Sequence, residues 1–290
     1  MKGIVLAGGA GSRLYPITKV YSKQLTVIYD KPLIYYPISI LMLGGIKEIL
    51  IISDKDTIPL YQKLFGDGSH LGLKFEYAVQ DAPNGIAEAF IIGAKFIGDD
   101  SVTLILGDNI FYGYLDFLYK ALKGNTGATI FGYQVRDPQR YGIVEFDKNG
   151  KAISIEEKPK VPKSQFAVPG IYIYNNEVIK ISKNLKPSAR GELEITDVNK
   201  VYLSNGKLQV EKIGRGVAWL DTGTPEALLK ASNFFGLIEE RQGLKVACLE
   251  EIALYKNFIT LSDFEKVISE MPNSMYRDYL LNLKKDYKEK

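Results

Sequence analysis

A short apolar run that ends in a glycine-rich turn constrains the fold of this chain most strongly. The run Gly3-Ile4-Val5-Leu6-Ala7 has no polar side chain, which is typical of a strand buried on both faces of a parallel sheet. The turn Gly8-Gly9-Ala10-Gly11-Ser12 and then Arg13 follow directly. Glycines at the carboxyl end of a strand let backbone N–H groups approach a ligand, commonly a phosphate. Because open α/β sheets bind ligands beyond those strand ends, the stretch predicts a nucleotide pocket with Arg13 at its mouth.

The glycine turn matches neither common phosphate-binding fingerprint. A dinucleotide fingerprint needs a third glycine at the position where this chain has Leu14. A P-loop needs a lysine followed by serine or threonine, and no such string follows Gly8. Two interpretations therefore stay open: a phosphate site of another kind, and a plain tight turn.

The scarcity of histidine and cysteine restricts the possible chemistry. Among 290 residues there is one histidine, His70, and one cysteine, Cys248, too few for His-ligated zinc or Cys-His chemistry. The glycines beside His70 indicate a loop position, which also argues against a Ser-His-Asp triad. Catalysis would therefore rest on Asp, Glu, Lys and Arg.

Charge and hydropathy exclude further classes. A net charge of +3 is too weak to argue for nucleic acid or an anionic membrane as partner. No stretch approaches the roughly 18 apolar residues of a membrane helix, and the first residues do not resemble a signal peptide. With a single cysteine, no internal disulfide can form, so we expect a cytoplasmic protein.

Apolar runs alternate with amphipathic segments, which predicts an α/β fold. Strands are expected at residues 3–6, 48–52, 73–80, 102–106 and 128–135, with helices between them at 33–43, 57–65, 86–97 and 116–122. Such βαβ units predict a Rossmann-like, mostly parallel mixed sheet flanked by helices.

Beyond residue 140 the pattern becomes shorter and richer in β-formers. Short strands are expected at 141–146, 152–156, 170–174, 210–214 and 217–220, and helices at 192–203, 225–242, 262–268 and 275–283. The pair Asn149-Gly150 predicts a hairpin, so antiparallel strands would be added to the sheet. We expect an α/β core over residues 1–242 and a C-terminal helical segment over residues 243–290.

Two aspartates follow predicted strands and are candidate metal ligands. Asp108 follows residues 102–106, and Asp221 follows Trp219-Leu220. Carboxylates at two strand ends can share Mg²⁺, which prefers oxygen ligands and keeps substrate phosphate in its shell. The simpler alternative is that Asp221 caps the helix at 225–242 and Asp108 stabilises a turn.

Three cations lie near predicted element ends, namely Arg13, Lys23 and Lys158. A triphosphate needs several cations, because its charge must be neutralised before an anionic nucleophile approaches. A solvated surface position is the alternative for each of them.

Several strings together resemble the sugar-nucleotidyltransferase family over nearly the whole chain. They are Leu6-Ala7-Gly8-Gly9-Ala10-Gly11-Ser12-Arg13-Leu14, Ser22-Lys23-Gln24, Asp30-Lys31-Pro32-Leu33-Ile34-Tyr35-Tyr36-Pro37, Leu106-Gly107-Asp108-Asn109, Arg140-Tyr141-Gly142, Glu156-Glu157-Lys158-Pro159, Gly191-Glu192-Leu193-Glu194-Ile195-Thr196-Asp197, Ala218-Trp219-Leu220-Asp221-Thr222-Gly223 and Arg241-Gln242-Gly243-Leu244-Lys245-Val246-Ala247-Cys248. The Tyr35-Tyr36-Pro37 and Trp219 strings resemble its thymidylyl-transferring branch.

This resemblance implies a reaction and its site. The phosphate of glucose 1-phosphate would attack the α-phosphorus of dTTP, giving dTDP-glucose and pyrophosphate, a first step toward dTDP-L-rhamnose and other deoxysugars. The implied catalytic residues are Arg13, Lys23, Asp108, Lys158 and Asp221, the two aspartates holding Mg²⁺. The implied nucleotide-binding residues are Leu6, Gly8, Gly9, Gly11, Ser12, Arg13, Gln80, Pro83 and Gly85. The implied sugar-binding residues are Asn109, Gly142, Glu157, Lys158, Val168, Thr196 and Trp219.

The resemblance also implies feedback control at a second site and a homotetramer. The residues implied for the second site are Tyr112, Gly113, Gly214, Arg215, Glu251 and Ile252.

Three alternatives remain at this stage. Uridylyl transfer would use the same parts, because uracil lacks only the thymine methyl group. A non-catalytic nucleotide-sugar sensor would be free to lose Arg13, Lys23, Asp108 or Asp221, all of which are present. An NAD-dependent dehydrogenase is disfavoured by the missing third glycine.

Overall fold

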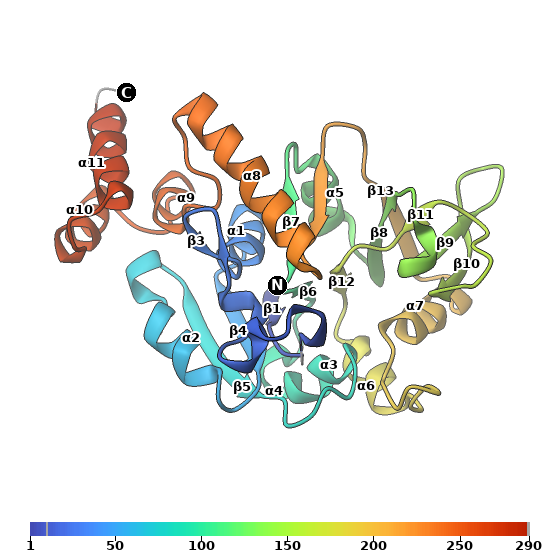
Figure 1. Ribbon diagram of the computed structural model, residues 1–290. Helices are drawn as coiled ribbons and strands as arrows, with labels where there is room; N and C mark the ends of the chain where they lie inside the picture. Colours follow the sequence, from blue (N-terminus) through green and yellow to red (C-terminus); the bar gives the residue numbers. More distant parts are fainter. Residues whose placement is uncertain (10, 289–290) are drawn as a thin grey trace.

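The computed structural model of the chain describes residues 1–9 and 11–288. Ala10, in the glycine turn, and Glu289 and Lys290, at the end of the predicted C-terminal segment, lie outside the described residues. Helices lie on both sides of a central sheet, with short antiparallel strands toward one end of the molecule and the last helices toward the other (Figure 1).

The described residues form a ten-stranded mixed sheet whose first part is parallel. The parallel strands, in spatial order, are β6 (Val102–Leu106), β1 (Lys2–Leu6), β4 (Glu48–Ser53) and β5 (Lys74–Val79). Val5 of β1 lies opposite Ile51 and Ile105, so β1 is hydrogen-bonded on both edges. The glycine turn therefore leaves from the middle of the parallel strands.

Antiparallel strands continue the sheet beyond β6. They are β12 (Ile171–Tyr174), β8 (Ala128–Gln134), β11 (Phe166–Ala167), β9 (Gly142–Phe146) and β10 (Ala152–Glu157), while β13 (Leu208–Lys212) pairs parallel with β8. The hairpin predicted at Asn149-Gly150 is confirmed, because β9 and β10 pair antiparallel and Gly150 has a φ of 80°.

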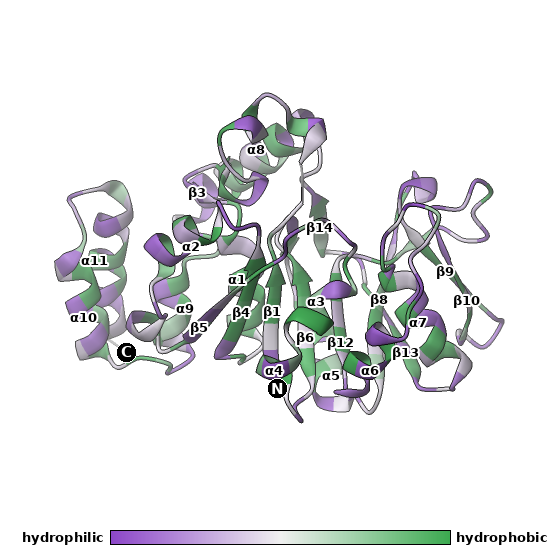
Figure 2. Ribbon diagram, turned by 90° about the horizontal axis from the view of Figure 1, so that it is seen from below, coloured by the Kyte–Doolittle hydropathy of each residue, from purple (hydrophilic) through white to green (hydrophobic). Residues whose placement is uncertain are grey.

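Two sets of helices cover the sheet. One core contains residues of α1 (Tyr35–Leu43), α2 (Ile58–Phe65), α5 (Asp116–Gly124), α9 (Leu249–Tyr255), α10 (Leu261–Glu270) and α11 (Met275–Lys288). The other contains residues of α3 (Glu88–Ile92), α4 (Ala94–Ile97), α6 (Glu177–Lys183) and α7 (Ile195–Ser204). Figure 2 shows the green, hydrophobic colour of the central strands.

Side chains of the central strands alternate between the two cores. Val5 belongs to the first core, whereas Ile4 and Leu6 belong to the second. In β4, Ile51 belongs to the first core and Ile52 to the second. Both faces are covered, which explains why these strands have continuous apolar runs instead of polar alternation. The predicted Rossmann-like mixed fold is confirmed.

Three predicted elements differ from the structure. The helix expected at residues 86–97 is divided into α3 and α4 at Gly93, where a Cβ would lie 3.0 Å from Ile4 Cδ1 and 2.9 Å from the Ala89 carbonyl oxygen. The helix expected at 192–203 begins at Ile195, because Leu193 is held by backbone bonds to the turn at Asn84. The strand expected at 217–220 is confirmed as β14 (Ala218–Asp221), but it lies outside the main sheet.

The partner of β14 is β7 (Asn109–Tyr112), a strand that the sequence analysis did not predict. A second small ladder joins β2 (Val27–Ile28) to β3 (Lys31–Pro32). The remaining short elements are the 3₁₀ turns η1 (Ser12–Leu14), η2 (Ile17–Lys19), η3 (Lys23–Leu25), η4 (Ser69–Leu71) and η5 (Pro138–Arg140).

Helix α8 (Pro225–Gln242) packs over a third apolar cluster that contains Leu14, Tyr36, Ile110 and Phe235. Its limits agree with the predicted helix, since Thr224 caps the amino end through Ala227 N and Gly243 ends it in the left-handed conformation.

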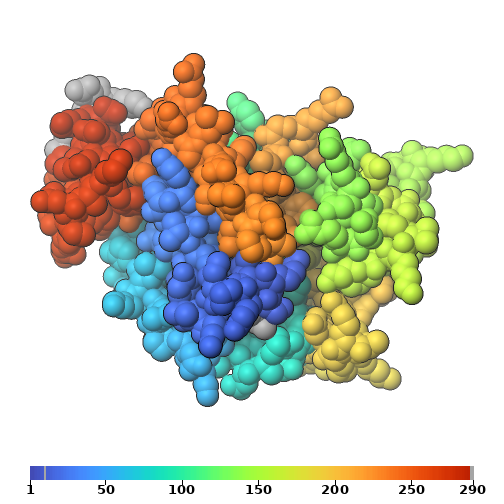
Figure 3. Space-filling model, viewed as in Figure 1, coloured from blue at the N-terminus to red at the C-terminus, as the bar shows by residue number. Residues whose placement is uncertain are grey.

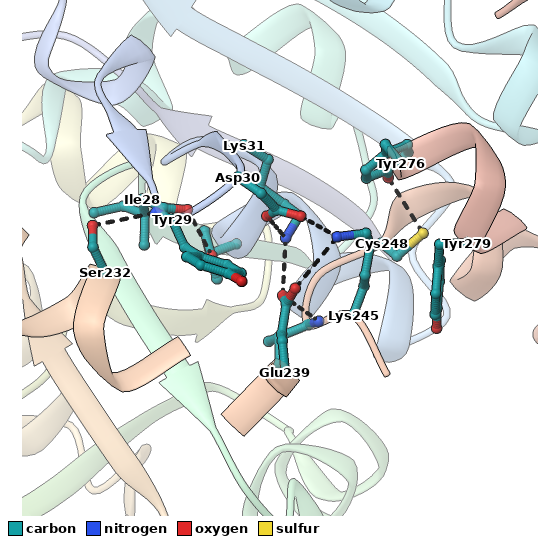
Figure 4. A network of polar contacts seen from close by, with 12 residues as sticks. Ile28, Tyr29, Asp30, Lys31, Ser232, Glu239, Lys245, Cys248, Tyr276 and Tyr279 are labelled. Carbon is teal, nitrogen blue, oxygen red and sulfur yellow. Dashed lines mark hydrogen bonds and ion pairs between the residues drawn. The ribbon is translucent and has the colours of Figure 1, made fainter. Parts of the chain in front are cut away.

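A buried ion network ties α8 to the β2–β3 hairpin (Figure 4). Lys31, 3% exposed, donates to Asp30 and, over 3.1 Å, to Glu239 of α8, while Lys245 donates to Asp30. Burial opposes ionisation of Asp30, but hydrogen bonds from Lys245 and Lys31 outweigh it and lower the pKa of that carboxyl. The network therefore holds its charges in pairs, as buried ions require.

The C-terminal helices share the core of the N-terminal half. Leu249, Ala253 and Leu254 of α9 lie in the same cluster as Ile38 of α1 and Phe65 of α2. The division at residue 242 stays a prediction. Within residues 1–9 and 11–288, no helix has both the length and the apolar character needed to span a membrane.

Replacing Glu239 tests the buried network. Glu239→Ala removes the carboxylate that accepts from Lys31 and from the backbone N–H of Val246. We expect the free energy of unfolding to fall by about 3–5 kcal/mol, because a buried ammonium loses a partner. Urea unfolding at one fixed protein concentration, followed by fluorescence of the single tryptophan, measures the change.

The matched control is Glu240→Gln on the exposed side of the same helix. It should change the free energy of unfolding by less than about 0.5 kcal/mol. Equal effects of the two substitutions would contradict a stabilising role for the network.

Candidate active site

Two neighbouring cavities open where β1 and β6 end. The first, of about 370 Å³, is lined by Gly8, Gly9, Lys23 and Gln80 among others; we call it the glycine-turn cavity. The second, of about 640 Å³, extends from Arg13 to α7 and is called the α7 cavity. Figure 3 shows this face, with blue N-terminal residues and orange α8 on one side and green and yellow residues on the other.

Asp108 and Asp221 lie together because β7 pairs with β14. Asp108 is the residue between β6 and β7, and Asp221, the last residue of β14, pairs with Asn109. The buried hydroxyl of Thr222 donates to the Asp108 carbonyl oxygen over 2.8 Å and holds the chain after β14 against Asp108. Both aspartates line the α7 cavity.

Each of the two aspartates is paired with a cation. Lys23 Nζ, on a residue only 7% exposed, donates to Asp108 Oδ2 over 2.6 Å. Arg140 donates to Asp221 Oδ2 over 3.2 Å and to Asp137 over 2.7 Å. Because each carboxylate is balanced by a cation, the pair can lie close without strong mutual repulsion.

Arg13 adds a third positive group at the same place. A Cβ on Gly223 would lie 2.8 Å from an Arg13 guanidinium nitrogen and 3.0 Å from Asp221 Oδ1. Arg13 and Asp221 therefore both lie close to the α-carbon of Gly223, so a larger residue at position 223 would collide with them. Burial and the charge of Asp221 raise the pKa of neighbouring Tyr141 to about 12, so its hydroxyl stays protonated at neutral pH.

The donor chemistry at Asp108 and Asp221 fits a divalent metal ion such as Mg²⁺. Within the described residues, no group of three or more His, Cys, Asp or Glu side chains could hold a metal. Two carboxylates alone leave most of an octahedral shell to be filled by substrate phosphate and water, which is the usual pattern for Mg²⁺.

All seven residues expected to bind the sugar line the α7 cavity: Asn109, Gly142, Glu157, Lys158, Val168, Thr196 and Trp219. Thr196 Oγ1 donates to Glu157 Oε2 over 2.6 Å, and a Cβ on Gly142 would lie 3.2 Å from that oxygen. Lys158 follows β10 with a φ of 42°, a conformation that non-glycine residues rarely adopt. Strained residues of this kind cluster at functional sites.

Asn109 holds the inner end of the α7 cavity together. Its side-chain oxygen accepts from the Trp219 indole N–H over 2.7 Å and from the backbone N–H of Gly170 over 3.0 Å. Its side-chain nitrogen donates to Asp108 Oδ1 over 2.7 Å. Being 5% exposed and bonded three times, Asn109 links strands from three parts of the chain.

The residues expected to bind the nucleotide separate into three groups. Gly8, Gly9, Gln80 and Pro83 line the glycine-turn cavity, whereas Ser12 and Arg13 line the α7 cavity. Leu6, Gly11 and Gly85 line neither cavity. Leu6 is buried in a core, and Gly11 and Gly85 have φ values of 54° and 108°, so the turns themselves require these glycines.

Two further arginines reach the α7 cavity that the sequence analysis did not single out as site residues. Arg140 contacts Asp221, and Arg190 forms a two-pronged pair with Glu194 at 2.8 Å and 2.9 Å. Burial opposes the charge of Arg190, but the hydrogen bond to Glu194 raises its pKa. Arg140 lies in one of the strings that carry the family resemblance, and Arg190 directly precedes another. The resemblance was therefore the signal that could have found them.

The six residues expected at a second site do not share one cavity. Tyr112, Gly113, Glu251 and Ile252 line a cavity of about 650 Å³, where burial raises the pKa of Glu251. Gly214 and Arg215 line a separate one of about 520 Å³, and Gly216 borders both. The second site expected over these six residues stays a prediction.

Comparisons with known proteins find relatives that match almost the whole chain. A profile of the nucleotidyl transferase family matches residues 2–236. The glucose-1-phosphate thymidylyltransferase of Neisseria gonorrhoeae is 53% identical over 285 residues, covering 98% of this chain and 99% of that protein. The protein of that name from Mycolicibacterium smegmatis is 53% identical over 284 residues, with 98% and 99% covered.

A solved structure gives the same result. The crystal structure of a Bacillus anthracis protein, assigned as a glucose-1-phosphate thymidylyltransferase and bound to sucrose, superimposes with a TM-score of 0.75. Its sequence is 43% identical, and the match covers 81% of this chain and 94% of that chain.

Truncation of Asn109 tests its part in building the site. Asn109→Ala removes the acceptor of the half-buried Trp219 indole N–H and of the buried Gly170 backbone N–H. We expect the free energy of unfolding to fall by about 2–4 kcal/mol, measured by urea unfolding with far-UV circular dichroism. The exposed Asn205→Ala, at the end of α7, is the control and should stay within about 0.5 kcal/mol. A stable Asn109→Ala protein would contradict the linking role.

Proposed function

Since the chain belongs to the nucleotidyl transferase family, we propose that it transfers the thymidylyl group of dTTP to α-D-glucose 1-phosphate, giving dTDP-glucose and pyrophosphate. One observation carries the proposal: Lys23, which lines the glycine-turn cavity, donates over 2.6 Å to Asp108, which lines the α7 cavity together with Arg13. A nucleoside triphosphate in the first and a sugar phosphate in the second would place their phosphates among these groups. The thymidylyltransferases that are 53% identical over almost the whole chain support the choice of reaction.

The reaction needs no covalent intermediate on the protein. A phosphate oxygen of glucose 1-phosphate forms a bond to the α-phosphorus, the bond from that phosphorus to the bridging oxygen breaks, and pyrophosphate leaves with the electron pair. The protein's contribution is positioning and charge stabilisation. A chain with a single histidine and a single cysteine is sufficient for such chemistry.

The cations would act at different phosphates. Arg13, beside Gly223, would steady the leaving pyrophosphate, and Lys23 would exchange part of its contact with Asp108 for the dTTP phosphates. Lys158, at the wall of the α7 cavity, would hold the sugar phosphate. Each contact neutralises charge that would otherwise repel the attacking phosphate.

Asp108 and Asp221 would hold Mg²⁺. When bound, the ion would lower the charge repulsion between the two substrates. The present partners of these carboxylates, Lys23 and Arg140, would then be free to face phosphate oxygens.

The hexose would lie against Asn109, Gly142, Glu157, Val168 and Thr196. Glu157 is an acceptor for hydroxyl groups, and Thr196 orients it. A homotetramer and feedback control belong to the proposal as expectations from family resemblance, and a cytoplasmic location belongs to it as the expectation from the single cysteine.

A substrate panel tests the choice of base. With glucose 1-phosphate, kcat/KM for dTTP should exceed that for UTP by about 10-fold or more, because UTP lacks the thymine methyl group, which is worth about 1–3 kcal/mol in a pocket, and also carries a ribose 2′-hydroxyl. Pyrophosphate release measures both reactions. Equal or reversed values would overturn thymidylyl transfer and favour uridylyl transfer.

Substitution of a proposed metal ligand tests the mechanism. Asp108→Asn should lower kcat/KM in Mg²⁺ by about 100-fold or more, since the amide carries no charge to hold the ion. Circular dichroism should remain that of the unsubstituted protein. The exposed Asp99→Asn serves as control and should keep full activity. Unchanged turnover of Asp108→Asn would reject the metal-binding role.

A further inference from the structure

Gln80 lines the glycine-turn cavity with its side-chain amide held in one orientation. It follows β5, is 8% exposed and lines that cavity with Gly8. Its Nε2 donates to Glu88 Oε2 over 2.7 Å and to the Gly85 carbonyl oxygen over 3.4 Å. A carboxylate and a carbonyl can only accept hydrogen bonds, so the nitrogen has to face them.

This orientation leaves the amide oxygen of Gln80 on the cavity side. Oε1 lies 3.3 Å from the point that a Cβ on Gly8 would occupy. Among residues 1–9 and 11–288, no hydrogen bond to Oε1 is found. The cavity therefore meets an acceptor at Gln80.

Glu88 is itself held in place. Its other oxygen, Oε1, accepts from Asn84 Nδ2 over 2.9 Å, and it lies in the first turn of α3. The turn between Gln80 and α3 is tied to the segment before α7, where Leu193 N donates to the Asn84 carbonyl and Ala87 N donates to the Leu193 carbonyl. Neither Glu88 nor Asn84 lines the cavity.

We propose that Glu88 is a positioning residue for base selection, acting through Gln80. Given the proposed function, on which this inference rests, the base of the nucleotide would lie in the glycine-turn cavity. A fixed acceptor at Gln80 favours a ring edge with an N–H, as in thymine and uracil. Cytosine has a lone pair at the same ring nitrogen, and two acceptors facing each other are unfavourable.

Without Glu88, the Gln80 amide could rotate by half a turn at little cost. It would then offer an N–H to the ring nitrogen of cytosine. The residue that keeps the amide from turning is thus as important for the choice between these bases as the residue that faces the base.

The experiment compares dTTP with dCTP in Glu88→Leu and in the unsubstituted protein. The ratio of kcat/KM for dTTP over dCTP should fall by about 10-fold, the equivalent of one hydrogen bond. The fall should come through KM, with kcat for dTTP within about twofold. Glu88→Gln should restore the ratio, because its carbonyl oxygen can accept from Gln80 while the Asn84 amide turns to accept from its nitrogen.

Two controls separate positioning from general damage. Glu76 lies in β5 and forms an ion pair with Lys74 of the same strand. The Glu76→Leu substitution should leave the ratio of kcat/KM for dTTP over dCTP unchanged. In a Gln80→Ala background, adding Glu88→Leu should not change the ratio further. If circular dichroism shows Glu88→Leu unfolded, Glu88→Ala carries the same expectation.

An unchanged ratio in the folded Glu88 variant, or a further fall in the Gln80→Ala background, would overturn the inference. Equilibrium binding of dTTP and dCTP without sugar phosphate gives the same ratio independently of turnover. A protein that binds dTTP selectively through Glu88 but releases no pyrophosphate would contradict the proposed function and support the inference.

Discussion

The pairing of β7 with β14 is the contact on which the site depends. These two short strands are separated by more than a hundred residues of sequence, and their register places Asp221 beside Asn109 and therefore beside Asp108. Asn109 then accepts from Trp219 and Gly170, so three distant segments meet at one side chain. Without this ladder, the two carboxylates would have no reason to be close, since β14 is not part of the main sheet.

Charge balance follows from that pairing. Two carboxylates brought together at the end of a buried strand repel each other unless cations accompany them. Lys23 and Arg140 are those cations here, and Arg13 lies next to them across Gly223. The same groups suit a reaction between anionic phosphates, because they exchange carboxylate oxygens for phosphate oxygens at little cost in desolvation.

The two cavities are also mechanically connected. Leu193 binds the backbone of the turn after Gln80, and the same segment leads into α7, which carries Thr196 toward Glu157. On the opposite side, the buried pairs of Lys31 and Lys245 attach the hairpin that follows Lys23 to α8. Backbone hydrogen bonds and buried ion pairs of this kind hold catalytic groups in place before substrate arrives.

The sequence alone was enough to predict the strands β1, β4 and β6 and the limits of α8. Continuous apolar runs and amphipathic segments are local signals that depend little on distant residues. The motif strings also predicted which residues would gather at the α7 cavity, including Glu157, Thr196 and Trp219. Strand β7, the break at Gly93, the pairing of Arg140 with Asp221 and the orientation of Gln80 by Glu88 were decided only by the tertiary structure. Each of these depends on a contact between residues whose proximity no local pattern encodes.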